Sequence, residues 1–62
     1  MYELWARRKE SSFELIVKFD RREEMYSRLD ELDNGDFVEG IILCDGKYVM
    51  YKKYEMAKGM RM

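Results

Sequence analysis

The chain has 62 residues, of which 40% are charged and 15% aromatic, and its net charge is −1. This length predicts a single domain near the lower limit for folding without disulfides or metals. The lone cysteine, Cys44, excludes an internal disulfide and fits a reducing compartment. The N-terminus has no hydrophobic region of signal-peptide length and no apolar run approaches the ~20 residues that span a bilayer, so we expect a cytoplasmic protein.

The charges are unevenly distributed along the chain. Residues 20–45 hold nine acidic and three basic side chains, whereas residues 46–62 hold one acidic and five basic ones. An acidic centre and a basic C-terminal end can orient an encounter with a charged partner.

The first third of the chain predicts two strands joined by a hairpin. Residues 2–9 begin with alternating types, which place Trp5 on the face opposite Leu4. Residues 13–19 alternate in the same way, with Phe13, Leu15, Val17 and Phe19 on one face and Glu14, Ile16 and Lys18 on the other. A short polar segment, residues 10–12, supplies the turn.

Residues 21–33 predict the one helix. Asp20 is a natural N-cap, and Glu23 falls where a capping box places a glutamate. Met25, Leu29 and Leu32 are spaced by four and three residues and form one apolar stripe. The pair at 34–35, Asn-Gly, predicts the end of the helix.

Two further strands are expected at 37–44 and 47–55. The continuous apolar run 41–43 indicates a central strand covered on both faces. Asp45-Gly46 predicts a two-residue type I′ turn between the strands. On the last strand we expect Tyr48, Met50 and Tyr54 on one face, and for residues 56–62 we expect a frayed tail or a short extension of that strand.

These elements predict an α+β fold of ββαββ order, a four-stranded mainly antiparallel sheet with one helix packed on one face. The second and third strands either pair in parallel or lie apart in a wholly antiparallel sheet. One helix covers only one face of the sheet, yet large apolar residues fall on both. We therefore expect a homodimer or another protein partner on the opposite face, with an interface of Trp5, Ile16, Tyr48, Met50 and Tyr54. For Trp5, a place under the helix is the alternative.

The residues that most enzymes use are missing. There is no histidine, which removes the usual general base and the commonest metal ligand. One cysteine cannot build a structural zinc site, and the four glycines lack a phosphate-binding spacing. We expect no catalytic residues, no cofactor and no metal.

Two charged regions suggest binding surfaces. The first is an acidic docking surface formed by Asp30, Glu31, Asp33, Asp36 and Glu39. Its resemblance to an EF-hand loop fails, because leucine occupies position 32, where an oxygen ligand is needed. The second is a basic and aromatic group that could bind single-stranded nucleic acid, although the acidic overall composition argues against it; it comprises Lys47, Tyr48, Tyr51, Lys52, Lys53, Tyr54, Lys58 and Arg61.

The runs 2–7 (YELWAR) and 48–51 (YVMY), with Phe19-Asp20 between them, resemble those of small uncharacterised proteins encoded by phages and mobile elements of Gram-positive gut bacteria. The resemblance implies two hairpins around a helix and an accessory role. Some phage proteins of this size inhibit host defence nucleases through acidic surfaces, which gives the acidic region a further interpretation.

Overall fold

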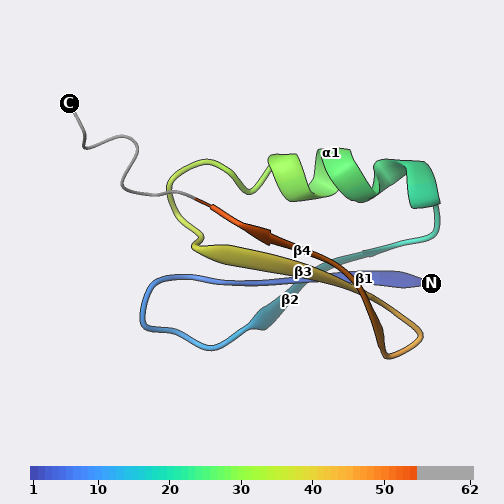
Figure 1. Ribbon diagram of the computed structural model, residues 1–62, viewed down its shortest axis with the longest axis horizontal. Coiled ribbons are helices and arrows are strands. Elements are labelled where there is room, and N and C mark those ends of the chain that lie inside the picture. The colour runs from blue at the N-terminus through green and yellow to red at the C-terminus, as the bar shows by residue number, and fades with distance from the viewer. Residues whose placement is uncertain (55–62) are drawn as a thin grey trace.

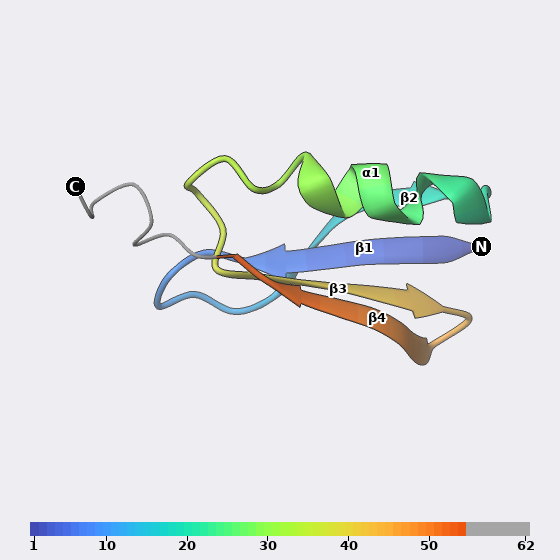
Figure 2. The ribbon, with the colours of Figure 1, turned by 45° about the horizontal axis from the view of Figure 1, so that its top comes forward.

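The computed structural model describes residues 1–54, which form one four-stranded sheet with a helical layer on one face (Figures 1 and 2). The elements in chain order are β1 (Tyr2–Arg7), β2 (Glu14–Phe19), the 3₁₀ turn η1 (Arg22–Glu24), α1 (Met25–Asp30), β3 (Glu39–Cys44) and β4 (Lys47–Lys53). The predicted α+β fold of ββαββ order is confirmed. Residues 56–62, for which a tail was expected, lie outside the described residues.

The sheet has the strand order β2-β1-β3-β4, and every neighbouring pair is antiparallel. Of the two arrangements left open by the sequence, the wholly antiparallel one is therefore correct. The strand predicted to be central, β3, lies between β1 and β4. Asp45 and Gly46 both have positive φ, 53° and 84°, as the predicted type I′ turn requires.

The helix is shorter than predicted, and its predicted cap is wrong. Arg21 is extended and the first turn is 3₁₀, so Asp20 lies too early in the chain to cap it; neither η1 nor α1 has a side-chain cap. After Asp30 the chain continues as turns, in which the Asn34 side chain accepts a hydrogen bond from the backbone N–H of Asp36. Gly35 there has a φ of 93°, which glycine adopts without steric strain.

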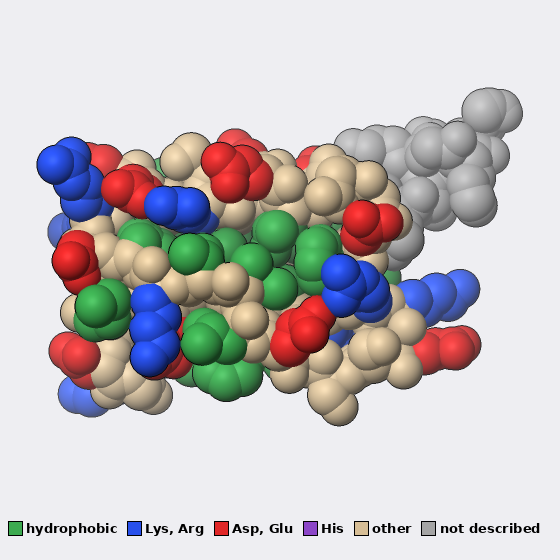
Figure 3. Space-filling view, turned by 180° about the vertical axis from the view of Figure 1, so that it is seen from behind, with side chains coloured by type: hydrophobic (Ala, Val, Ile, Leu, Met, Phe, Trp, Pro, Cys, Tyr) green, Lys and Arg blue, Asp and Glu red, His purple; other side chains and the backbone are tan. Residues whose placement is uncertain are grey.

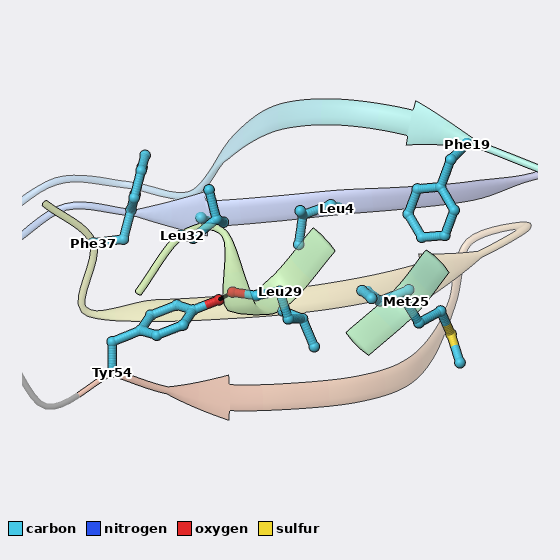
Figure 4. Packing of buried hydrophobic residues seen from close by; sticks show 9 residues of the cluster. Leu4, Phe19, Met25, Leu29, Leu32, Phe37 and Tyr54 are labelled. Atoms are coloured by element: carbon cyan, nitrogen blue, oxygen red, sulfur yellow. Dashed lines mark hydrogen bonds between the residues drawn. The ribbon is translucent and has the colours of Figure 1, made fainter. Parts of the chain in front are cut away.

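The core lies between the helical layer and the sheet (Figure 4). The predicted stripe of Met25, Leu29 and Leu32 is buried. It packs with Leu4, Ala6, Phe19, Phe37, Ile42 and Tyr54. Burial of this apolar surface is the main term favouring the fold.

Two irregularities interrupt the alternation of the edge strands. Between Leu4 and Trp5 the pairing partner on β2 jumps from Val17 to Leu15, which leaves Ile16 as an extra residue. Between Ile42 and Leu43 the partner on β4 jumps from Met50 to Tyr48 in the same way, which leaves Val49 as the extra residue. A β-bulge of this kind changes which residues of a strand face each side of the sheet.

Tyr54 closes the core beyond the end of β4. Its hydroxyl donates a hydrogen bond of 2.6 Å to the carbonyl of Leu29, and its side chain lies over Gly40 on β3 (Figure 4). A Cβ atom at position 40 would lie 2.8 Å from the tyrosine oxygen. Gly40 is therefore where the sheet makes room for this tyrosine. Burial raises the pKa of Tyr54 to about 12.

Candidate functional site

The face of the sheet away from α1, here called the open face, carries an uncovered group of apolar and aromatic side chains. Residues opposite one another on neighbouring strands share a face. The pairings of Trp5 with Leu15 and Ile41, of Ile41 with Tyr51, and of Leu43 with Tyr48 place these six side chains together on the open face.

Trp5 lies near the middle of this surface. With Phe13, Ile41 and Leu43 it lines a shallow depression that has no polar surface. The indole N–H donates a hydrogen bond of 3.0 Å to the Glu3 carboxylate, two residues away on the same strand. This bond satisfies the only polar atom of the indole within the chain, so the ring can contact a partner without leaving a donor unpaired.

A charged group borders one end of the apolar surface. Arg7 donates a hydrogen bond of 3.0 Å to Glu39, its direct neighbour across the β1–β3 pair, and Lys53 follows Glu39 across the next pair. The hydrogen bond from Arg7 holds the pKa of Glu39 below its usual value. Partial desolvation, with the nearby Glu39 carboxylate, raises the pKa of Tyr51. The hydrogen bond between Arg7 and Glu39 pairs two of the charges at this border.

At the opposite end the open face carries a second mixed pair, Glu3 on β1 and Lys18 on β2, which are direct cross-strand neighbours. The wholly apolar row of Leu15, Trp5, Ile41 and Tyr51 thus lies between two rows that carry charges, because Leu43 and Tyr48 continue the row of Glu3 and Lys18. In the view from behind, hydrophobic side chains gather in a band along the molecule, with acidic and basic groups above and below them (Figure 3). On the open face, Phe13, Leu15, Tyr48 and Tyr51 each expose 40% or more of their surface.

Of the five predicted interface residues, the structure places two on the open face. Trp5 lies there, half-buried among Ile41 and Leu43, and Tyr48 lies there with 63% of its surface exposed. The prediction that Ile16, Met50 and Tyr54 lack a cover within the chain is wrong. Tyr54 is only 4% exposed and belongs to the core, and Ile16 and Met50 pack against the core.

Five residues of the open face were not among the predicted interface residues: Phe13, Leu15, Ile41, Leu43 and Tyr51. The bulge at Ile16 explains why Leu15 and Phe13 were missing from the predicted interface. It moves Leu15 to the side of Trp5, away from Val17 and Phe19, which face the core. For Ile41 and Leu43, the alternation around the buried Ile42 was an available signal.

The predicted acidic docking surface is divided by the sheet. Glu31, Asp33 and Asp36 are exposed around the turns after α1, and Asp30 binds Lys52 at 2.8 Å on the same side. Glu39 is not with them, because it lies on the open face with Arg7. Within residues 1–54 no group of three acidic or cysteine side chains is placed to hold a metal ion.

The basic and aromatic group is divided as well. Tyr48, Tyr51 and Lys53 face the open side, whereas Lys52 pairs with Asp30 beside the helix. Tyr54 is buried, and Lys58 and Arg61 lie outside the described residues. The described residues therefore do not present these side chains as one continuous surface.

A second depression lies on the helix side, at the edge where η1 meets β4. It is lined by Arg22, Glu23, Met25, Tyr26, Val49 and Met50. Tyr26 there is 68% exposed, about as much as Tyr48 on the open face, so the two tyrosines are comparable positions on opposite sides of the sheet. Among the described elements no helix has the length and apolar character needed to cross a membrane.

Comparison with known proteins gives no assignment: no family model, no curated protein and no solved structure matches this chain.

Proposed function

We propose that this chain is a non-enzymatic protein–protein interaction module that binds its partner through the open face. The observation that carries the proposal is the continuous apolar surface on the side of the sheet that α1 does not cover. It consists of Trp5, Phe13, Leu15, Ile41, Leu43, Tyr48 and Tyr51. A large contiguous apolar surface on a small domain is characteristic of an interaction site.

The composition of this surface supports a protein partner. Tryptophan and tyrosine are the residues that most often dominate the energy of protein interfaces. The open face offers one tryptophan and two tyrosines in its apolar part, with an ordered Arg7–Glu39 pair at the border. An apolar centre with a polar rim is the usual organisation of such interfaces.

The cellular setting is part of the same proposal. The single, partly buried cysteine is compatible with the reducing conditions of the cytoplasm. The resemblance of the YELWAR and YVMY runs to proteins of phages and mobile elements suggests an accessory role there. Inhibition of a host defence nuclease is a narrower form of this role, and the exposed Glu31, Asp33 and Asp36 are the residues that would support it.

Photo-crosslinking tests which face is used. A photoreactive phenylalanine derivative replaces Tyr48 in one variant and Tyr26 in another, since both tyrosines are well exposed but lie on opposite sides of the sheet. Irradiation in cells should give a discrete protein adduct, either with this chain or with another, from position 48 only. Equal labelling from both positions, or an adduct from position 26 alone, would contradict the proposal.

Replacement of Trp5 tests the centre of the surface. Trp5→Ala should weaken adduct formation from position 48 by at least tenfold, because a central aromatic anchor contributes about 2 kcal/mol or more to many interfaces. Unchanged crosslinking would remove Trp5 from the interface. Titration with labelled single-stranded oligonucleotides at two salt concentrations covers the nucleic-acid alternative, since phosphate contacts give a steep salt dependence.

A further inference from the structure

We infer that the partner of the open face is an amphipathic helix of another protein, with acidic side chains on both sides of its apolar stripe. This inference rests on the proposed function and specifies the kind of partner. Three features of the open face support it: the shape of its apolar surface, the apolar lining of its depression, and two lysines that lie on either side of it.

The apolar surface of the open face is a diagonal band. Its middle is a complete row across the four strands, formed by Leu15, Trp5, Ile41 and Tyr51. At one end Phe13, just before β2, extends the band from Leu15 towards the row of Arg7. At the other end Leu43 on β3 and Tyr48 on β4 continue it in the row of Glu3. The remaining two corners of the face carry charged side chains.

The dimensions of this band match those of a helix. The band crosses three strand spacings of about 4.8 Å and about four residues of about 3.3 Å along the strands, which gives a diagonal of roughly 20 Å. A helix of about 13 residues has this length at about 1.5 Å per residue. Its diameter of about 10 Å lets one side of it cover two neighbouring rows, which are about 7 Å apart.

The depression beside Trp5 favours a helix over an extended peptide. Its lining, which includes Phe13, Ile41 and Leu43, presents no polar surface. An extended segment on these side chains would lose water from its backbone N–H and C=O groups without gaining a partner for them. A helix satisfies most of its backbone hydrogen bonds internally and contacts the surface through side chains. The other face of the same sheet is covered in this way by α1 (Figure 2).

Two lysines determine the charge expected of the partner. Both carboxylates of the open face, Glu3 and Glu39, already accept a hydrogen bond from a side chain of this chain. Lys18 on β2 and Lys53 on β4 lie on opposite sides of the band, and within residues 1–54 neither belongs to an ion pair. Acidic residues on both sides of the helix's apolar stripe would bring a carboxylate to each lysine, whereas basic residues there would meet like charge.

A synthetic helical peptide of about 14 residues, the length of the band, tests the inference. It has leucines at helical spacing, glutamates on both sides of the leucine stripe, alanines elsewhere and no tryptophan. Trp5 is the only tryptophan of the chain, and its emission should shift to shorter wavelength when the peptide covers it. A peptide with lysine in place of every glutamate should bind about tenfold more weakly or less. A peptide with a central proline, which breaks the helix, should leave the emission unchanged.

Charge reversal on the chain provides the matched control. Lys18→Glu and Lys53→Glu should each weaken binding of the acidic peptide, and the double variant should prefer the lysine peptide. Lys47→Glu changes the same residue type on β4, but in the row of Tyr2, which packs against the core on the helix side. At about 0.15 M salt, which screens distant charges, it should change neither affinity appreciably. A reversed preference in the double variant excludes unfolding as the cause of the loss, and far-ultraviolet circular dichroism checks each variant.

Three outcomes would overturn the inference: no shift of the Trp5 emission by the acidic helical peptide at millimolar concentration, an equal shift by the proline peptide, or equal affinities for the acidic and lysine peptides. A dimer that excludes the peptide, detected by light scattering, would assign the open face to a second copy instead. In each of these cases a protein adduct from position 48 alone would leave the proposed function standing. Equal crosslinking from positions 48 and 26 would overturn both.

Discussion

The two faces of the sheet are built from neighbouring residues but differ in what covers them. On the helix face, Leu4 and Ile42 are fully buried beneath Leu29. One position further along the same strands, Trp5 and Leu43 lie on the open face without a cover from residues 1–54. A single backbone thus carries a finished core on one side and an apolar surface on the other.

This difference separates two roles that apolar residues play in a small protein. Residues of the helix face contribute their free energy within one chain, at any concentration. Residues of the open face contribute fully only when a partner removes them from water, so their effect depends on that partner's concentration. Substitutions that compare the faces pairwise can therefore separate folding from binding.

The largest contrast is expected between two adjacent isoleucines of β3. Ile42→Ala should lower the free energy of unfolding by about 2–5 kcal/mol, because it leaves a cavity in the core. Ile41→Ala, on the open face, should cost about 1 kcal/mol in dilute solution, since that side chain is only partly buried. Urea unfolding at low protein concentration measures both.

Ile42→Val keeps this comparison measurable if the alanine variant does not fold, with an expected loss of about 0.5–1.5 kcal/mol. Equal losses at positions 41 and 42 in dilute solution would show that the two faces are not distinct in the way described.

The second contrast concerns the space under Tyr54. Gly40→Ala should destabilise the fold by about 1–3 kcal/mol, because the new methyl group would lie 2.8 Å from the tyrosine oxygen and 3.1 Å from a methyl carbon of Leu29. The same substitution in a Tyr54→Phe background should cost less, since the nearest atom is gone. A double-mutant cycle by urea unfolding measures the coupling, and strictly additive losses would contradict the close contact.

The strand positions and the core were largely predictable from the sequence, because alternation, the four-and-three spacing of Met25, Leu29 and Leu32, and the Asp45-Gly46 turn all act over short distances. The composition of the open face was less predictable. The alternation rule assumes that each residue of a strand has one cross-strand partner. The extra residues Ile16 and Val49 have none in the pairing, so the faces change over at these positions.

The prediction of which side of the sheet Met50 and Tyr54 face was wrong for a different reason. Its alternation correctly groups Met50 with Tyr54, but no local pattern says which side of the sheet the helix covers. That side is decided by long-range packing, of which the bond from Tyr54 to Leu29 is a part. The prediction that Asp20 caps the helix was wrong because the helical region begins with a 3₁₀ turn at Arg22, whose N-cap residue is Arg21.

The third contrast compares two tyrosines of the last strand region. Tyr54→Phe should cost about 1 kcal/mol near neutral pH, because the carbonyl of Leu29 still accepts a bond from the N–H of Leu32. Tyr51→Phe, on the open face, should change the stability of the dilute monomer little. Thermal or urea unfolding of the two variants side by side tests the difference.

The buried hydroxyl of Tyr54 also makes the free energy of unfolding depend on pH. Tyr54 has a pKa of about 12 in the fold against its ordinary 10.0, so the folded chain binds more protons than the unfolded chain between these values. Stability from this group is complete below pH 10 and decreases as the pH rises towards 12. The wild type should therefore lose more stability than Tyr54→Phe over that interval, and parallel losses would contradict a buried, neutral hydroxyl.

The smallest effect is expected at the border of the open face, where Glu39→Gln removes one charge from the pair with Arg7. The hydrogen bond from Arg7 lowers the pKa of Glu39 below its ordinary 4.5, so the carboxylate stabilises the fold above that pH and this contribution disappears as the pH falls through the lowered pKa. Because both side chains of the pair contact solvent, the loss at neutral pH should be small and should shrink further in high salt. The urea midpoints of wild type and variant should converge below pH 4.5. A gap that persists at low pH would mean that Glu39 acts through packing and not through its charge. A variant that crosslinks from position 48 as strongly as the wild type would place the energy of the interface in the apolar side chains around Trp5.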